Sequence, residues 1–334
     1  MFVKRALLKT EKDNIIQFLN SMDLFWDEDI VDTYYIEINN EVIATGSRSD
    51  KVIKCLAVKK EWQSHKLISL IIDAITESFF KEGIYHYFVV TRLENEEIFK
   101  SLGFKEIIKN DLIIFMEKGI SSITLKLTAL KEGLERELKI DLDKLNIGAI
   151  ILNANPVTNG HLKLIEYASK YHDLLLLFLV EEEKSWLTYI ERTSLLFIST
   201  QHLGNIKILP STEYLVSSAT FPNYFLKDNV SRYEYMAMVD PLIFKKYFMP
   251  IFNIKKRYIG TETKPYMISY NNALVKALDD KIEVIERYEE NGVTISSSHV
   301  RDLIDSNGVD AVLKYIPKQA QTLFKKIVRS KVDG

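Results

Sequence analysis

The chain has 334 residues, of which 47% are hydrophobic and 27% charged, a composition typical of an ordinary globular protein with about two domains. Its 44 basic and 46 acidic side chains leave a net charge of −2, which does not indicate a nucleic-acid-binding surface or a charged tail. The single cysteine, Cys55, excludes an intrachain disulfide or a cysteine-based metal site, and its apolar neighbours predict a core position. The first residues lack the features of a signal peptide, and the longest apolar run, 174–180, is far too short to cross a bilayer. We therefore expect a cytoplasmic protein with no membrane partner.

Residues 1–120 predict a first domain in which strands and helices are mixed. Apolar and alternating runs predict strands at 31–38, 42–47, 52–58, 85–91 and 112–117. Helical spacing predicts helices at 11–20, 65–80 and 95–102. This order, together with the segments 55–63 and 99–104, resembles the GNAT acetyltransferase fold, which implies an α+β domain.

One part of this first domain departs from the GNAT pattern. GNAT enzymes usually have the pattern Gln/Arg-x-x-Gly-x-Gly/Ala, in which the backbone at the small residues cradles the pyrophosphate of acetyl-CoA. Here Gln63 is followed by Lys66 and Ile68 at the two small positions. Bulky side chains obstruct the close approach that glycine allows. We therefore expect this domain not to bind acetyl-CoA in the usual way. Carrier-protein recognition, a remnant cofactor pocket and structural support are the roles left open.

Residues 121–145 have mixed charges and predict a connecting helix or linker, and residues 146–334 predict a second domain. Strands are expected at 147–152, 174–180, 206–209 and 257–260, with helices after Gly160 and at 190–200. Strands that alternate with helices favour a parallel sheet with right-handed crossovers. Ligands of such sheets bind beyond the carboxyl ends of the strands.

The segment 153–161, Asn-Ala-Asn-Pro-Val-Thr-Asn-Gly-His, joins the first of these strands to a helix. Its position places Gly160 and His161 at a helix N-terminus, where free N–H groups and the helix dipole favour phosphate. Thr158, Gly160 and His161 resemble the Thr-x-Gly-His signature of the nucleotidyltransferase superfamily. A turn and helix cap with a surface histidine is the plainer interpretation of these four residues alone.

A second segment, 295–301, reads Ile-Ser-Ser-Ser-His-Val-Arg and resembles another signature of the same superfamily. Ser296, Ser297 and Ser298 could cap a helix and bind phosphate oxygens, and Arg301 could reach the beta and gamma phosphates. An ordinary serine cap with a solvated arginine is the alternative. Because both signatures occur in the right order, we predict a nucleotide site.

Three further segments extend the resemblance: 181–185 after a strand, the hydroxyl- and aromatic-rich block 217–227, and 258–262, which ends a strand. Together with the two signatures they resemble the citrate lyase ligase family, which joins a GNAT-like domain to a nucleotidyltransferase-like domain. The resemblance implies an α/β chain whose C-terminal Rossmann-like parallel-sheet domain follows a GNAT-like α+β domain.

The resemblance also implies an AMP-forming acid–thiol ligase. Acetate would attack ATP to give acetyl-AMP, and the acetyl group would pass to a CoA-like prosthetic group on the acyl-carrier (gamma) subunit of citrate lyase. His161 would stabilise the charge on the phosphate that is attacked, with Thr158 and the backbone of Gly160 assisting. Lys184 would neutralise acetate or the alpha phosphate, unless it is only a solvated loop residue.

The remaining roles concern the nucleotide. Ser296, Ser297, Ser298 and Arg301 would hold the departing pyrophosphate. Asn155 and Arg192 are assigned to nucleotide binding, although an exposed helical arginine is the plainer interpretation of Arg192. Magnesium would be bound mainly through ATP phosphates and water, so no set of protein metal ligands is predicted. Asp240 and Glu262 are candidates to help hold magnesium or ribose.

Three other functions remain open at this stage. A small-molecule adenylyltransferase of CoA or NAD biosynthesis would use the same two signatures with a different acceptor. A GNAT-type acetyltransferase with a regulatory nucleotide-binding domain is the second, and Lys66 and Ile68 weigh against it. A nucleotide sensor that docks onto a partner is the third, and the presence of His161 and Arg301 weighs against that.

Overall fold

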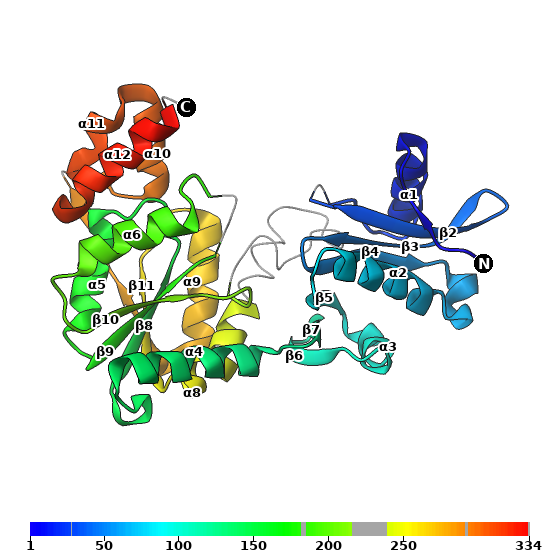
Figure 1. Cartoon of the computed structure of the whole chain (residues 1–334), viewed down its shortest axis with the longest axis horizontal. Helices are drawn as coiled ribbons and strands as arrows, with labels where there is room; N and C mark the ends of the chain where they lie inside the picture. Colours follow the sequence, from blue (N-terminus) through cyan, green and yellow to red (C-terminus); the bar gives the residue numbers. More distant parts are fainter. Residues whose placement is uncertain (28, 182–184, 216–238, 291–292, 333–334) are drawn as a thin grey trace. The chain divides into compact units, whose positions relative to one another are not determined.

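The computed structural model describes residues 1–27, 29–181, 185–215, 239–290 and 293–332 (Figure 1). The chain divides into two compact units. The first unit contains residues 1–126, and the second contains the described residues of 127–217 and 240–334. Within the described part of the chain, no helix has the length and apolar character needed to span a membrane.

The first unit is built on a seven-stranded mixed sheet with the order β1-β2-β3-β4-β5-β7-β6. The strands are β1 Lys4–Arg5, β2 Asp32–Ile38, β3 Glu41–Ser49, β4 Val52–Val58, β5 His86–Arg92, β6 Lys105–Lys109 and β7 Ile113–Gly119. Its helices are α1 Lys9–Ser21, α2 Leu67–Lys81 and α3 Glu96–Ser101. The predicted mixture of strands and helices is confirmed. The sequence did not predict β1 or β6, which are short and rich in charged residues.

The pairing of β4 with β5 is parallel, whereas the other neighbouring strands of this sheet are antiparallel. The two strands pair only through Val52 with Phe88 and Ile53 with Val89. Cys55, two residues after Ile53, has a left-handed φ of 51° and is fully buried. Its predicted core position is confirmed. Burial raises the pKa of its thiol to about 12, so Cys55 is protonated at neutral pH.

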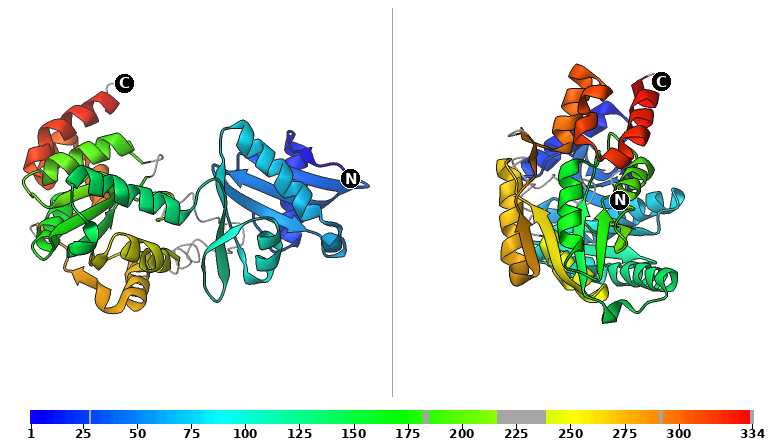
Figure 2. Two further views of the ribbon diagram at one scale, coloured as in Figure 1. Left: turned by 60° about the horizontal axis from the view of Figure 1, so that its bottom comes forward. Right: turned by 90° about the vertical axis from the view of Figure 1, so that its left-hand side faces the viewer.

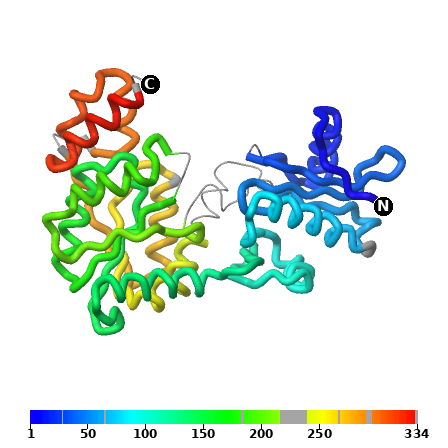
Figure 3. The backbone as a smooth tube through the Cα atoms, viewed as in Figure 1, coloured from blue at the N-terminus to red at the C-terminus, as the bar shows by residue number. Residues whose placement is uncertain are grey.

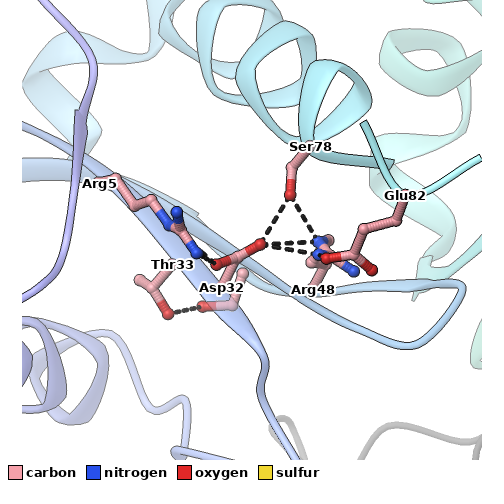
Figure 4. Close-up of polar contacts among 7 residues, drawn as sticks. Arg5, Asp32, Thr33, Arg48, Ser78 and Glu82 are labelled. Carbon is pink, nitrogen blue, oxygen red and sulfur yellow. Dashed lines mark hydrogen bonds and ion pairs between the residues drawn. The ribbon is translucent and has the colours of Figure 1, made fainter. Parts of the chain in front are cut away.

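An ion network centred on two buried charges, Asp32 and Arg48, ties three strands of the first unit to α2 (Figure 4). Asp32 on β2 accepts hydrogen bonds from Arg5 Nε at 2.9 Å, Arg48 Nε at 3.0 Å and Ser78 Oγ at 2.7 Å. Arg48, on β3, is fully buried and also contacts Glu82 at the end of α2. Burial opposes ionisation of Asp32, but the hydrogen bonds from Ser78 and Arg5 lower its pKa.

The predicted helix at 65–80 begins two residues late, at Leu67. The residue before it, Lys66, has a φ of 54°, in the left-handed region that favours glycine. A left-handed residue interrupts the right-handed helix, so the preceding residues form a separate 3₁₀ helix, Lys60–His65.

The second unit is built on a five-stranded sheet with the order β10-β9-β8-β11-β12, and every neighbouring pair is parallel. The strands are β8 Ile147–Leu152, β9 Leu174–Leu179, β10 Ile206–Pro210, β11 Ile254–Gly260 and β12 Ile282–Ile285. The predicted parallel sheet is confirmed. The chain moves outward from β8 to β10 and then returns to the other side of β8 with β11, so the strand order switches between β8 and β11.

The helices of this unit flank the sheet and extend beyond one end of it (Figures 1 and 2). Among the described residues, these α-helices are α4 Ile123–Leu138, α5 Asn159–Ser169, α6 Tyr189–Thr200, α8 Met249–Ile251, α9 Pro265–Leu278, α10 Ser297–Asn307, α11 Val309–Val312 and α12 Gln321–Val332. The helix α4 occupies most of the predicted linker 121–145. The last three helices form a group at one end of the unit, as the tube in Figure 3 shows.

The core of the second unit joins these helices to the sheet. Leu177 and Leu179 of β9 belong to the same buried cluster as Val300 of α10 and Phe324 of α12. This shared core fixes the N-terminus of α10 relative to the carboxyl ends of the strands.

Candidate active site

A pocket of about 280 Å³ lies at the carboxyl ends of the strands in the second unit, where the strand order switches. It is formed by the loops that follow β8, β11 and β12 and by the starts of α5, α9 and α10. Its lining residues are Asn153, Ala154, Asn155, His161, Glu262, Thr263, Lys264, Met267, Arg287, Ser296, Ser297, Ser298 and Arg301.

The loop after β8 ends in a helix cap that orients His161. Thr158 is the N-cap of α5 and is almost completely buried. Its backbone N–H donates to Nδ1 of His161 at 3.1 Å, and its hydroxyl lies 2.9 Å from the same atom. Because a backbone N–H can only donate, Nδ1 is an acceptor and the proton of the neutral ring is assigned to Nε2. Thr158 therefore positions His161 so that it offers an N–H from Nε2.

The ring of His161 is neutral at physiological pH. Burial lowers its pKa to about 4, and the positive charge of Arg287 lowers it in the same direction. A neutral histidine with its proton on Nε2 can donate one hydrogen bond to a phosphate oxygen from that atom while Nδ1 accepts from Thr158.

The start of α10 presents three hydroxyl groups. Ser296 is the N-cap, and its Oγ accepts a hydrogen bond from the N–H of His299 at 3.1 Å. Its Oγ also lies 3.2 Å from that of Ser298. The predicted serine cap is thus confirmed, while phosphate binding by these hydroxyls stays a prediction.

The two signature segments contact each other directly although they are far apart in the chain. Ser297 Oγ donates to the carbonyl of Pro156 at 2.8 Å, and Arg301 donates to the carbonyl of Asn155. A Cβ built on Gly160 would meet the carbonyl of Ile295 at 3.4 Å, an ordinary contact. The protein's own atoms therefore do not require glycine at this position.

Two further residues hold the loop after β8 in place. Asn155 accepts a hydrogen bond from the N–H of Leu187 at 2.9 Å through its side chain. Arg192 on α6 is fully buried, and its Nη1 donates to the carbonyls of Asn153 at 2.9 Å and Val180 at 2.7 Å. The interpretation of Arg192 as an exposed helical arginine is therefore wrong, because its guanidinium joins the ends of β8 and β9.

The pocket brings together most of the residues predicted to bind the nucleotide. Asn155, His161, Arg301 and the three serines line it, whereas Thr158, Gly160 and Arg192 do not. Lys184 and the block 217–227 lie outside the described residues. The role of each residue in binding or catalysis stays a prediction.

The two acidic candidates differ in their surroundings. Glu262 lines the pocket, whereas Asp240 is buried in an ion pair with Arg257 at 3.1 Å and accepts a hydrogen bond from the hydroxyl of Tyr270 at 2.6 Å. Asp240 thus has partners within the protein and is not one of the residues that line the pocket.

Sequence reasoning missed three polar or charged residues of the pocket: Thr263, Lys264 and Arg287. Pro265 at the first position of α9 was a usable signal for the first two, because proline is favoured where a helix begins. Arg287 follows β12, a strand of four residues whose apolar run is broken by Glu283. That break hid both the strand and the arginine that follows it.

Comparison with known proteins adds an independent line of support. A family profile described as "Citrate lyase ligase C-terminal domain" matches residues 147–324. The [citrate [pro-3S]-lyase] ligase of Escherichia coli (strain K12) is 30% identical over 329 residues, which cover 94% of this chain and 90% of the relative. The chain belongs to the citrate lyase ligase family. The ligase of the same name from Haemophilus influenzae is 30% identical and covers 98% of this chain and 100% of its own length.

Membership of the citrate lyase ligase family makes this chain an enzyme of the ligase class. The profile begins at the first residue of β8 and ends within α12, so it includes every residue that lines the pocket.

Solved structures that resemble part of the chain include acetyltransferases. Escherichia coli ElaA is 12% identical and covers 35% of this chain and 99% of its own, with a TM-score of 0.33. The ribosomal-protein-S18-alanine N-acetyltransferase from Escherichia coli is 15% identical over 36% of this chain and 96% of its own, with a TM-score of 0.30.

Proposed function

We propose that this citrate lyase ligase family member uses ATP to activate acetate and transfers the acetyl group to a thiol on the acyl-carrier subunit of citrate lyase. The observation that carries the proposal is the contact between the two signature segments. Ser297 and Arg301 bond to the carbonyls of Pro156 and Asn155, so hydroxyl and guanidinium donors stand beside His161 in one pocket.

The first step is nucleophilic attack by an acetate oxygen on the alpha phosphorus of ATP. The bond from this phosphorus to the bridging oxygen breaks, and pyrophosphate leaves with the electron pair. Nε2–H of His161 donates to an oxygen of the alpha phosphate, where charge develops in the transition state. The hydroxyls of Ser296 and Ser298, the N-terminus of α10 and Arg301 hold the leaving pyrophosphate.

The second step moves the acetyl group from acetyl-AMP to sulfur. The thiol of the CoA-like prosthetic group loses its proton and attacks the acetyl carbonyl carbon, and AMP leaves. The product is the acetyl thioester of the carrier subunit. Lys184 would neutralise acetate or the alpha phosphate, a role that stays a prediction from the sequence.

Magnesium fits this site as a companion of the nucleotide. Glu262 is the one carboxylate among the described residues that line the pocket, and the described part of the chain contains no cluster of three potential metal ligands. A magnesium ion would therefore be held mainly by ATP phosphates and water, and it would neutralise phosphate charge. Because the reaction consumes ATP, we place it in the cytoplasm.

The experiment that tests this function is acetate-dependent exchange of labelled pyrophosphate into ATP. Purified protein is incubated with magnesium and ATP, with and without acetate, and then with the acyl-carrier subunit. Exchange that requires acetate supports acetyl-AMP formation. Exchange with 4′-phosphopantetheine or nicotinamide mononucleotide, and none with acetate in the presence of carrier, would favour an adenylyltransferase.

A further inference from the structure

An ion pair between Glu262 and Arg287 lies in the wall of the pocket. Arg287 Nη1 is 2.5 Å from Glu262 Oε2, and the two side chains are 26% and 19% exposed. These side chains come from the segments after β12 and β11, which are adjacent parallel strands. The pair therefore faces the same edge of the sheet as the two signature segments.

The backbone beneath the pair is fixed by two hydrogen bonds. The N–H of Thr261 donates to the carbonyl of Ile285 at 2.9 Å, and the N–H of Arg287 donates to Thr261 Oγ1 at 2.9 Å. With the backbone held on both sides, a change of partner by Arg287 requires only rotation of its side chain.

Arg287 acts on the group that we place at the reacting phosphate. Its charge contributes to the lowered pKa of His161, so the two side chains lie within electrostatic range. A phosphate bound by Nε2 of His161 would lie within range of the same guanidinium.

The charges in the pocket are unbalanced in favour of an anion. Lys264, Arg287 and Arg301 are cationic and line the pocket, while Glu262 is the one carboxylate among its described lining residues. His161 is neutral. A triphosphate brings several negative charges to this site, and each of them is repelled by Glu262 and attracted by the three cations.

We propose that Glu262 is an internal counter-anion that holds Arg287 in the free enzyme, and that a nucleotide phosphate takes its place on Arg287 when ATP binds. Arg287 then joins Arg301 as a cationic ligand of the triphosphate, in a pocket that Lys264 also lines. The exchange keeps the guanidinium paired, because a phosphate oxygen replaces a carboxylate oxygen as its anionic partner. The inference deepens the proposed function and rests on it for the identity of the nucleotide as ATP.

The proposal predicts opposite changes in nucleotide affinity when Glu262 or Arg287 is replaced. Glu262→Gln removes the competing anion and should tighten nucleotide binding about threefold to tenfold. Arg287→Gln removes a ligand and should weaken binding about tenfold or more. The double variant should bind more tightly than Arg287→Gln, because it also removes the carboxylate that repels the phosphates and that Arg287 no longer neutralises.

We would measure these affinities by calorimetry with the full-length protein and α,β-methylene-ATP, with and without magnesium. Glu286→Gln is the matched control, because it removes the same charge from an exposed neighbour of Arg287 and should leave the affinity unchanged. Arg287→Lys keeps the charge and covers the event that Arg287→Gln does not fold. It should bind less tightly than the wild type and more tightly than Arg287→Gln.

Two results would overturn the proposal. Weaker binding by Glu262→Gln would assign Glu262 to ribose, or to magnesium if the loss occurs only with magnesium. Unchanged binding by both Arg287 variants would remove Arg287 from the phosphate site. Acetate-dependent pyrophosphate exchange by the wild type tests the proposed function separately. Its result does not depend on the affinities of the Glu262 and Arg287 variants, so the two failures can be told apart.

Discussion

The helices α2 and α5 each follow a strand of their own sheet, after β4 and β8, but their first residues differ in backbone and surroundings. At the start of α2, Lys66 is exposed and adopts a left-handed φ of 54°, and Ile68 packs against the apolar core of the first unit. At the start of α5, Gly160 meets no close protein atom that would require glycine, and His161 lines a pocket.

This difference shows that the start of a helix after a strand can either pack against the core, as in α2, or line a pocket, as in α5. The start of α5 combines a residue without a side chain, a hydrogen-bond donor and the hydroxyls of a second helix. The start of α2 is occupied by a lysine and an isoleucine. We therefore expect changes at α5 to reduce nucleotide chemistry and changes at α2 to affect only local stability.

The largest expected effect comes from His161. His161→Ala removes the Nε2–H donor at the phosphate that is attacked, and we expect acetate-dependent pyrophosphate exchange to fall by at least ~100-fold. The measurement is the initial rate of exchange at saturating ATP and acetate. His202→Ala is the control, because this histidine is partly exposed and contacts Glu166. An unchanged rate in His161→Ala would remove His161 from the mechanism.

A smaller effect is expected from Gly160. Gly160→Ala places a methyl group where the nucleotide would approach the backbone, so the KM for ATP should rise about tenfold. The free energy of unfolding should stay the same or increase by up to about 1 kcal/mol, because alanine is the better helix former. Gly133→Ala in α4, where a Cβ would meet no atom within 4 Å, should leave the KM unchanged. If both variants bind ATP like the wild type, the nucleotide does not approach Gly160.

Much of this site could be predicted from the sequence, because its signals are local. The apolar run of β8, the proline and glycine that follow it, and the serine cap of α10 predicted the elements on which His161 and Arg301 lie. The prediction that the two segments form one site came from their resemblance to two signatures of the same superfamily, which occur here in the right order.

The rest depended on contacts between distant residues. Arg192 reads as a polar helical residue, and only the fold brings the carbonyls of Asn153 and Val180 to its guanidinium. The network of Arg48 and Asp32 was missed for the same reason, since neither residue has a local pattern that indicates a buried ion pair. Arg287 was missed because β12 is too short for a periodic signal.

The pH dependence of stability sharpens the description of α5. The pKa of His161 is about 4 in the folded chain, against about 6.5 for an ordinary histidine. Between these values the unfolded chain binds a proton that the folded chain does not, so His161 reduces stability as the pH falls from 6.5 towards 4. His161→Gln should therefore lose less stability than the wild type between pH 7 and pH 5, as measured by urea unfolding. Equal losses would mean that His161 titrates normally.

The smallest effect is expected at the start of α2. Lys66→Gly changes a residue of the first unit, outside the pocket that we assign to the nucleotide. Acetate-dependent exchange should therefore stay within about twofold of the wild-type rate. Glycine adopts a φ of 54° without the strain of a side chain, so the first unit should gain up to about 1 kcal/mol of stability. Exchange rates and urea unfolding of the same preparation measure both quantities. A large loss of exchange would show that the first unit takes part in acetate activation. The start of α2 would then have a role in the reaction, as we propose for the start of α5.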